Sequence, residues 1–139
     1  MGTIHVEHDS GDRFTSRVRD HIVVTDQPSA DGGTDTGPTP VELLVTSLAS
    51  CVAHYAHRYL TRHCIDAAGL AVDADFTMAT DRPARIASMT ITLTPPTALP
   101  AERYDAFLAV ASHCTVHNTL EHPPGLTIGL RTEAAERAA

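Results

Sequence analysis

Cysteine and histidine are the residue types in this chain that could carry chemistry. The sequence has three cysteines, Cys51, Cys64 and Cys114, together with nine histidines. A cysteine thiolate can act as a nucleophile, as a reductant or as a metal ligand. Because an odd number of cysteines does not fit a secreted disulfide scaffold, we expect reduced thiols in a cytoplasmic protein.

Cys51 lies in the middle of a predicted amphipathic helix that runs from Pro40 to His63. Thr39 and Glu42 predict a capping box at its start, and proline suits the first helical position. The predicted inward face is an apolar stripe at helical spacing, formed by Leu44, Leu48, Cys51, Tyr55 and Tyr59. Packing is therefore the alternative to chemistry for Cys51.

Cys114 follows a second predicted helix, from Pro100 to about His113, and precedes a short helical turn at residues 115–120. At that place the positive end of the helix dipole lowers the pKa of a thiol, so we expect a reactive Cys114. Cys64 stands just beyond the long helix and matches no motif. A buried packing role is the simplest interpretation of Cys64.

The remaining sequence alternates between short strands and turns. The predicted strands cover residues 3–8, 14–19, 21–25, 70–78, 86–93 and 126–131. A loop at 26–39 leads into the long helix, and a frayed helix is expected from Thr132 to residue 139. Strands, a helix, strands and a helix in this order predict an α+β fold with antiparallel sheet. The length predicts one domain, residues 1–139.

The composition argues against some partners. A formal charge of −7 does not favour binding to nucleic acid or to an anionic membrane. No signal peptide is visible at the start, and the apolar part of the long helix is too short to cross a bilayer. We therefore expect a cytoplasmic protein that binds neither nucleic acid nor membrane.

Two cysteine motifs resemble one known family. Residues 33–51 read GTDTGPTPVELLVTSLASC and residues 114–120 read CTVHNTL. Together they resemble the OsmC/Ohr family of osmotically induced and organic hydroperoxide resistance proteins, over nearly the whole chain. The resemblance implies an intertwined homodimer in which antiparallel sheet wraps around two central helices, with active sites at the interface.

The resemblance also implies a thiol peroxidase. Cys51 would be the peroxidatic cysteine that attacks an organic hydroperoxide, and Cys114 the resolving cysteine that closes a disulfide with it. No bound cofactor is implied, and an external dithiol or lipoyl-type reductant would restore the thiols. Well-characterised members carry Glu ten residues before the reactive cysteine, paired with an Arg. Here Val41 holds that position, Glu42 points away from Cys51, and no arginine clearly matches.

The same residues are compatible with three other functions. The pairs Cys51 with His54 and Cys114 with His117 form a Cys₂His₂ set that could hold zinc. A binding module for an apolar small molecule, with non-catalytic or redox-sensing cysteines, is the main alternative to the peroxidase. A hydrolase using Cys51 and His54 is weaker, because the two side chains diverge on one helix and no orienting acid is apparent.

Overall fold

Five strands and three helices make up the fold, and a computed structural model describes residues 1–132 of the chain. The strands are β1 (Ile4–Ser10), β2 (Arg13–Val18), β3 (His21–Thr25), β4 (Ala71–Met78) and β5 (Ile86–Thr94). The helices are α1 (Pro40–Arg62), α2 (Tyr104–Ser112) and α3 (Thr115–Glu121), with 3₁₀ turns at Ser29–Asp31 and Ala101–Arg103. The predicted α+β class is confirmed. The frayed helix predicted after Thr132 lies outside the described residues.

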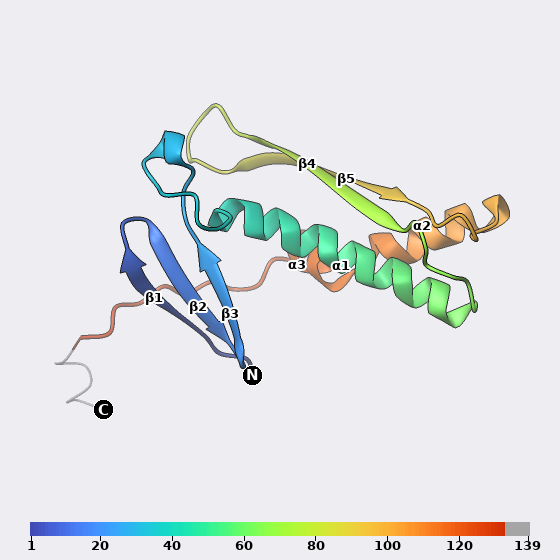
Figure 1. Ribbon diagram of the computed structural model, residues 1–139, viewed down its shortest axis with the longest axis horizontal. Coiled ribbons are helices and arrows are strands. Elements are labelled where there is room, and N and C mark those ends of the chain that lie inside the picture. Colours follow the sequence, from blue (N-terminus) through green and yellow to red (C-terminus); the bar gives the residue numbers. More distant parts are fainter. Residues whose placement is uncertain (133–139) are drawn as a thin grey trace.

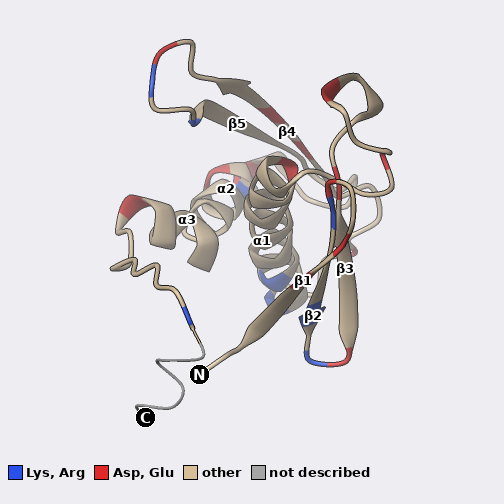
Figure 2. Ribbon diagram, turned by 90° about the vertical axis from the view of Figure 1, so that its left-hand side faces the viewer, with Lys and Arg blue, Asp and Glu red and all other residues tan. Residues whose placement is uncertain are grey.

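Within residues 1–132, the strands pair antiparallel and form two separate sheets. Strands β1, β2 and β3 form a meander, with Thr15 opposite Val24, while β4 and β5 form a hairpin, with Phe76 opposite Met89. The hairpin lies along α1, and the three-stranded sheet stands beside the N-terminal end of that helix (Figure 1). Helices α2 and α3 cover another side of α1, so that α1 lies between all the other layers (Figure 2).

The start of α1 follows the predicted capping box. The Thr39 hydroxyl accepts a hydrogen bond from the Glu42 amide at 3.1 Å, and the Glu42 carboxylate accepts one from the Thr39 amide at 3.4 Å. Pro40 occupies the first helical position, where its missing N–H costs nothing. The helix therefore begins at the residue that the sequence predicts.

Asp26 fixes the chain between β3 and α1. This side chain is only 1% exposed. Its carboxylate accepts hydrogen bonds from the Thr36 hydroxyl at 2.6 Å, the Thr34 hydroxyl at 2.7 Å and the amides of Thr36 and Gln27. The hydroxyl of Thr36, followed by that of Thr34, holds the pKa of Asp26 well below its usual range. The backbone amide of Asp26 donates to the Pro38 carbonyl at 3.2 Å, which ties the end of β3 to the start of α1.

The buried face of α1 differs from the predicted stripe. Leu48 and Tyr59 are buried as predicted, but Leu44 is 43% exposed and Cys51 is only half-buried. The buried residues of α1 are Val45, Leu48, Val52, Ala56, Tyr59 and Leu60. The reason is that the β4–β5 hairpin and α2 pack on different sides of α1. The buried face of α1 is therefore wider than a single stripe and is rotated relative to the predicted one. Cys51 consequently lies at the edge of the core.

The second half of the chain completes the core around α1. Phe107 and Ala111 of α2 are buried there, together with Leu99 and Cys114. None of the helices within residues 1–132 combines the length and the apolar character needed to cross a bilayer.

The strand predicted at residues 126–131 is wrong. That stretch has no regular structure, and its alternating apolar residues Leu126, Ile128 and Leu130 are 86%, 99% and 86% exposed. A strand needs a neighbouring edge that offers backbone hydrogen bonds. In one chain the segment runs away from the helices without meeting such an edge (Figure 1).

Candidate thiol site

The two motif cysteines meet at the start of α3. Cys114 is the N-cap of that helix, and its Sγ accepts a hydrogen bond from the His117 amide at 3.4 Å. The Sγ of Cys51, which comes from the middle of α1, accepts one from the Val116 amide at 3.5 Å. Consecutive amides of one short helix thus donate to two sulfurs that are far apart in the sequence.

Tyr55 connects the two helices that carry these sulfurs. It lies one turn after Cys51 on α1, and its hydroxyl is 2.7 Å from the hydroxyl oxygen of Thr115, the first residue of α3. Tyr59, one further turn along α1, is held from the other side, since Arg103 donates to its hydroxyl at 3.3 Å. These contacts tie α1 to the start of α3 through Tyr55 and to the turn before α2 through Tyr59.

The two sulfurs have different environments. Cys51 is half-buried, whereas Cys114 is completely buried, with 0% exposure. Burial raises the pKa of the Cys114 thiol, and the adjacent Cys51 thiol raises it further. The prediction of a lowered pKa at Cys114 is therefore wrong. The His117 amide does oppose the rise, but the loss of solvent outweighs it.

The group that approaches Cys51 could not be found from sequence spacing. The mid-helix position of Cys51 indicates that some outside donor must reach its sulfur, and the structure identifies the backbone amide of Val116. A backbone donor leaves no mark in side-chain identity. Glu42 is engaged in the capping box at the start of α1, and Arg13, the arginine nearest the family's position, lies 2.6 Å from Asp9 on the first sheet.

Cys64 does not have the buried role that the sequence predicts. It is exposed, with a positive φ of 53°, just after the end of α1. The chain turns sharply there, because His63 and Cys64 close the helix with bonds to carbonyls of its last turn. This sharp reversal directs Cys64 outward, so it is a surface thiol.

The described residues do not form the Cys₂His₂ zinc site that the two motifs could supply. His54 is exposed and its ring lies edge-on to Tyr55, 5.8 Å between centroids, while the ring of His117 is 3.5 Å from a carboxylate oxygen of Glu121. Across residues 1–132, no three side chains of His, Cys, Asp or Glu come close enough to hold a metal ion together. The two cysteines meet, but His54 and His117 do not join them in a ligand set.

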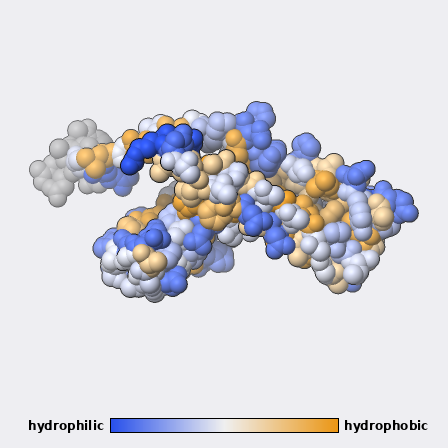
Figure 3. Space-filling view, turned by 90° about the horizontal axis from the view of Figure 1, so that it is seen from above, coloured by the Kyte–Doolittle hydropathy of each residue, from blue (hydrophilic) through white to orange (hydrophobic). Residues whose placement is uncertain are grey.

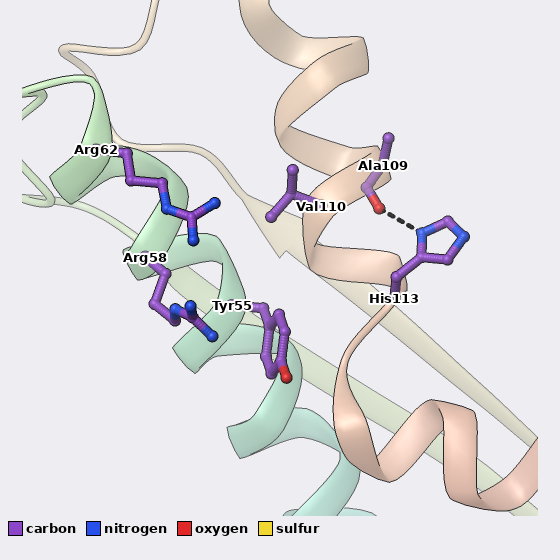
Figure 4. Close-up of a pocket in the computed structure, with 6 residues that line it drawn as sticks. All are labelled: Tyr55, Arg58, Arg62, Ala109, Val110 and His113. Atoms are coloured by element: carbon purple, nitrogen blue, oxygen red, sulfur yellow. Dashed lines mark hydrogen bonds between the residues drawn. The ribbon is translucent and has the colours of Figure 1, made fainter.

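A pocket that the sequence does not predict lies beside the thiols, between α1 and α2. It has a volume of about 400 Å³ and is lined by Tyr55, Arg58, Arg62, Ala109, Val110 and His113. Tyr55 reaches it from the turn after Cys51, and His113 precedes Cys114 (Figure 4). The only sequence signal was a pair of arginines spaced four residues apart.

The sequence model of one protein family, described as OsmC-like protein, matches residues 33–129, which include both cysteine motifs. This chain belongs to the OsmC-like family. The match confirms the resemblance drawn from the two motifs. A comparison with curated proteins gave no match.

Solved structures of OsmC-like proteins share the fold. An osmotic stress induced and detoxification response protein from Psychrobacter arcticus aligns with a TM-score of 0.77 at 27% identity, covering 86% of this chain and 88% of that one. The organic hydroperoxide resistance protein OsmC from Legionella pneumophila gives 0.64 at 15% identity, over 86% and 88%. The organic hydroperoxide resistance protein OhrB of Bacillus subtilis gives 0.62 at 15% identity, over 88% and 92%.

Proposed function

We propose that this OsmC-like protein is a thiol-dependent peroxidase that reduces organic hydroperoxides in the reducing cytoplasm. The observation that carries the proposal is the meeting of Cys51 and Cys114 at the first amides of α3. Membership of the OsmC-like family supports a peroxide-related stress role. The hydroperoxide resistance proteins of Legionella pneumophila and Bacillus subtilis, which share the fold, point to the same substrate class.

The reaction takes place in two steps at the protein. The Cys51 thiolate attacks the terminal peroxide oxygen of ROOH, the O–O bond breaks, and the alkoxide leaves and takes a proton to become ROH. Cys51 is then a sulfenic acid. The sulfur of Cys114 attacks the sulfenic sulfur, a disulfide forms, and the hydroxyl group leaves as water. The peroxide is reduced by two electrons and the two thiols are oxidised by two.

The environments of the two sulfurs support this order of steps. Peroxide can reach the half-buried Cys51 more readily than the fully buried Cys114. The Val116 amide donates to the Cys51 sulfur, and a donated hydrogen bond favours negative charge on sulfur. Cys114, whose pKa is raised, stays a neutral thiol at pH 7 and is suited to wait for the sulfenic acid.

The cycle needs a reductant from outside the chain. A dithiol or a lipoyl-type carrier would attack the disulfide through a mixed disulfide, then release it with its second thiol and leave both cysteines reduced. No cofactor bound to the protein takes part in any of these steps.

We also propose that the working form is a homodimer. The single chain exposes 10285 Å² of surface. A compact monomer of 14.8 kDa would expose roughly 7,000 Å². The β1–β3 sheet and the C-terminal segment project to one side with open space between them (Figure 3). A second chain would cover these surfaces, including the exposed Leu126, Ile128 and Leu130.

Peroxide consumption by cysteine variants tests the proposed activity. With dithiothreitol as reductant and cumene hydroperoxide as substrate, Cys51→Ser should lose turnover, because no nucleophile remains. Cys114→Ser should oxidise once at Cys51 and then turn over poorly. The surface variant Cys64→Ser is the matched control and should keep the parent rate. If Cys51→Ser and Cys114→Ser both consume peroxide as fast as the parent, the proposal is wrong.

A further inference from the structure

The pocket between α1 and α2 combines apolar walls with two guanidinium groups. Arg58 and Arg62 are one helical turn apart on α1, so their side chains project from the same face. Figure 4 shows Arg62 pointing from α1 toward Val110 of α2, while Arg58 lies along α1 toward Tyr55; both line the pocket. Ala109, Val110 and the ring of Tyr55 supply the apolar part of the lining.

The charge of this pocket is not neutralised by its own lining. None of the six residues that line it is acidic. The Arg58 guanidinium lies over the Tyr55 ring, 5.3 Å from its centroid, which fixes its place without cancelling its charge. The positive charge of this pocket contrasts with the formal net charge of −7 of the whole protein.

The size of the pocket suits a small organic molecule. A volume of about 400 Å³ lies in the range of ligand sites, which are mainly apolar with a few polar groups that set orientation. Arginine recognises carboxylates through paired N–H donors, and two arginines on one face provide more donors than one carboxylate needs. Inorganic ions would fill the charged end and leave the apolar walls without a partner.

We infer that this pocket binds a small carboxylate with an apolar chain, its carboxylate held by Arg58 and Arg62 and its chain lying against Ala109, Val110 and Tyr55. The inference goes beyond the peroxidase proposal and does not rest on it, since no thiol takes part in the binding. It gives a ligand class to the OsmC-like fold of this chain whether or not the cysteines turn over peroxide.

Calorimetric titration with octanoate tests the inference, and Cys51→Ser protein is used so that thiol chemistry cannot contribute. We expect octanoate to bind at least tenfold more tightly than 1-octanol, which has the same chain length and no charge. Inorganic phosphate, which has charge and no chain, should also bind at least tenfold more weakly than octanoate. Equal affinity for octanoate and octanol, equal affinity for octanoate and phosphate, or no binding of octanoate would each overturn the inference.

Arginine variants locate the site. Replacing both arginines (Arg58→Gln with Arg62→Gln) should weaken octanoate binding at least tenfold, while the lysine pair, which keeps the charge, should recover part of the affinity. Arg17→Gln with Arg82→Gln is the matched control, because it removes the same charge from exposed positions on β2 and in the β4–β5 turn. If the control pair weakens binding as much as the pocket pair, the effect comes from overall charge and the assigned site is wrong.

Discussion

At the scale of single residues, burial separates two thiols of the same chemical type. Cys114 is enclosed by α1 and α2 and has a raised pKa, while Cys51 stays partly open to solvent. A protonated, enclosed thiol reacts slowly with peroxide but lies beside the sulfenic acid when it forms. The proposed division of labour therefore depends on environment and not on residue identity.

The raised pKa of Cys114 predicts how disulfide closure responds to pH. Below its pKa, the thiolate fraction of a cysteine rises about tenfold per pH unit, so closure should accelerate with pH between 6 and 9. The rate can be measured by trapping the Cys51 sulfenic acid with dimedone in competition with closure. Cys114→Ser should leave the sulfenic acid trappable at every pH. A closure rate that is flat or falls over this range would contradict the raised pKa.

Asp26 predicts a second pH effect, on stability. Its folded pKa is depressed, so its contribution is complete above the pKa near 3.9 of an unfolded aspartate, and is lost as pH falls through the lower folded value. Asp26→Asn should therefore lower the urea midpoint at pH 7. Both carboxylate oxygens of Asp26 accept hydrogen bonds, whereas an asparagine side chain has only one acceptor oxygen. The difference in urea midpoint between the variant and the parent should become smaller in strong acid.

Urea titrations at pH 7, 5 and 3 measure this gap, with Asp31→Asn as the exposed control, for which no change is expected. A gap that widens as the pH falls would show that the Asp26 carboxylate does not stabilise the fold as described.

At the scale of elements, local sequence signals predict structure correctly, whereas packing between distant elements leaves no such signal. The start of α1 and the meander could be predicted, because caps, turns and strand alternation are written within a few residues. The buried face of α1, the Val116 donor and the pocket at Arg58 depend on which elements pack together, which spacing does not encode. Residues 126–131 alternate like a strand, but a strand forms only where an edge is available.

The capping box gives a prediction at this scale. Thr39→Ala removes the hydroxyl that accepts from the Glu42 amide and should cost about 1 kcal/mol of unfolding free energy. Thr46→Ala is the control, since its exposed hydroxyl bonds only to the Glu42 carbonyl within α1. Urea unfolding measures both. Equal losses in the two variants would show that the cap has no special role.

At the scale of the whole molecule, the exposed surface is larger than a compact monomer would leave. The β1–β3 sheet and the C-terminal segment project with open space between them (Figure 3), and Leu126, Ile128 and Leu130 of that segment are almost fully exposed. The proposed homodimer would cover this apolar surface with a second chain. Sedimentation at micromolar concentration should accordingly find a species of twice 14.8 kDa.

Ile128 tests which surface the second chain covers. This residue is 99% exposed in one chain, and burying an isoleucine contributes roughly 1.5–3 kcal/mol. Ile128→Asp should therefore weaken dimerisation at least tenfold in sedimentation equilibrium. Thr127→Asp, at the neighbouring position, adds the same charge without removing an apolar side chain and should weaken dimerisation less. Unchanged dimerisation in Ile128→Asp would place the interface elsewhere.

The most direct test of the central claim is to map the sulfur linkage after oxidation. One equivalent of cumene hydroperoxide is added to the reduced protein, remaining thiols are alkylated, and peptides are identified by mass spectrometry. The account predicts that Cys51 and Cys114 are joined in one disulfide, with Cys64 alkylated and one peroxide consumed per chain. Alkylated Cys51 and Cys114 beside unconsumed peroxide, or oxidation confined to Cys64, would contradict it.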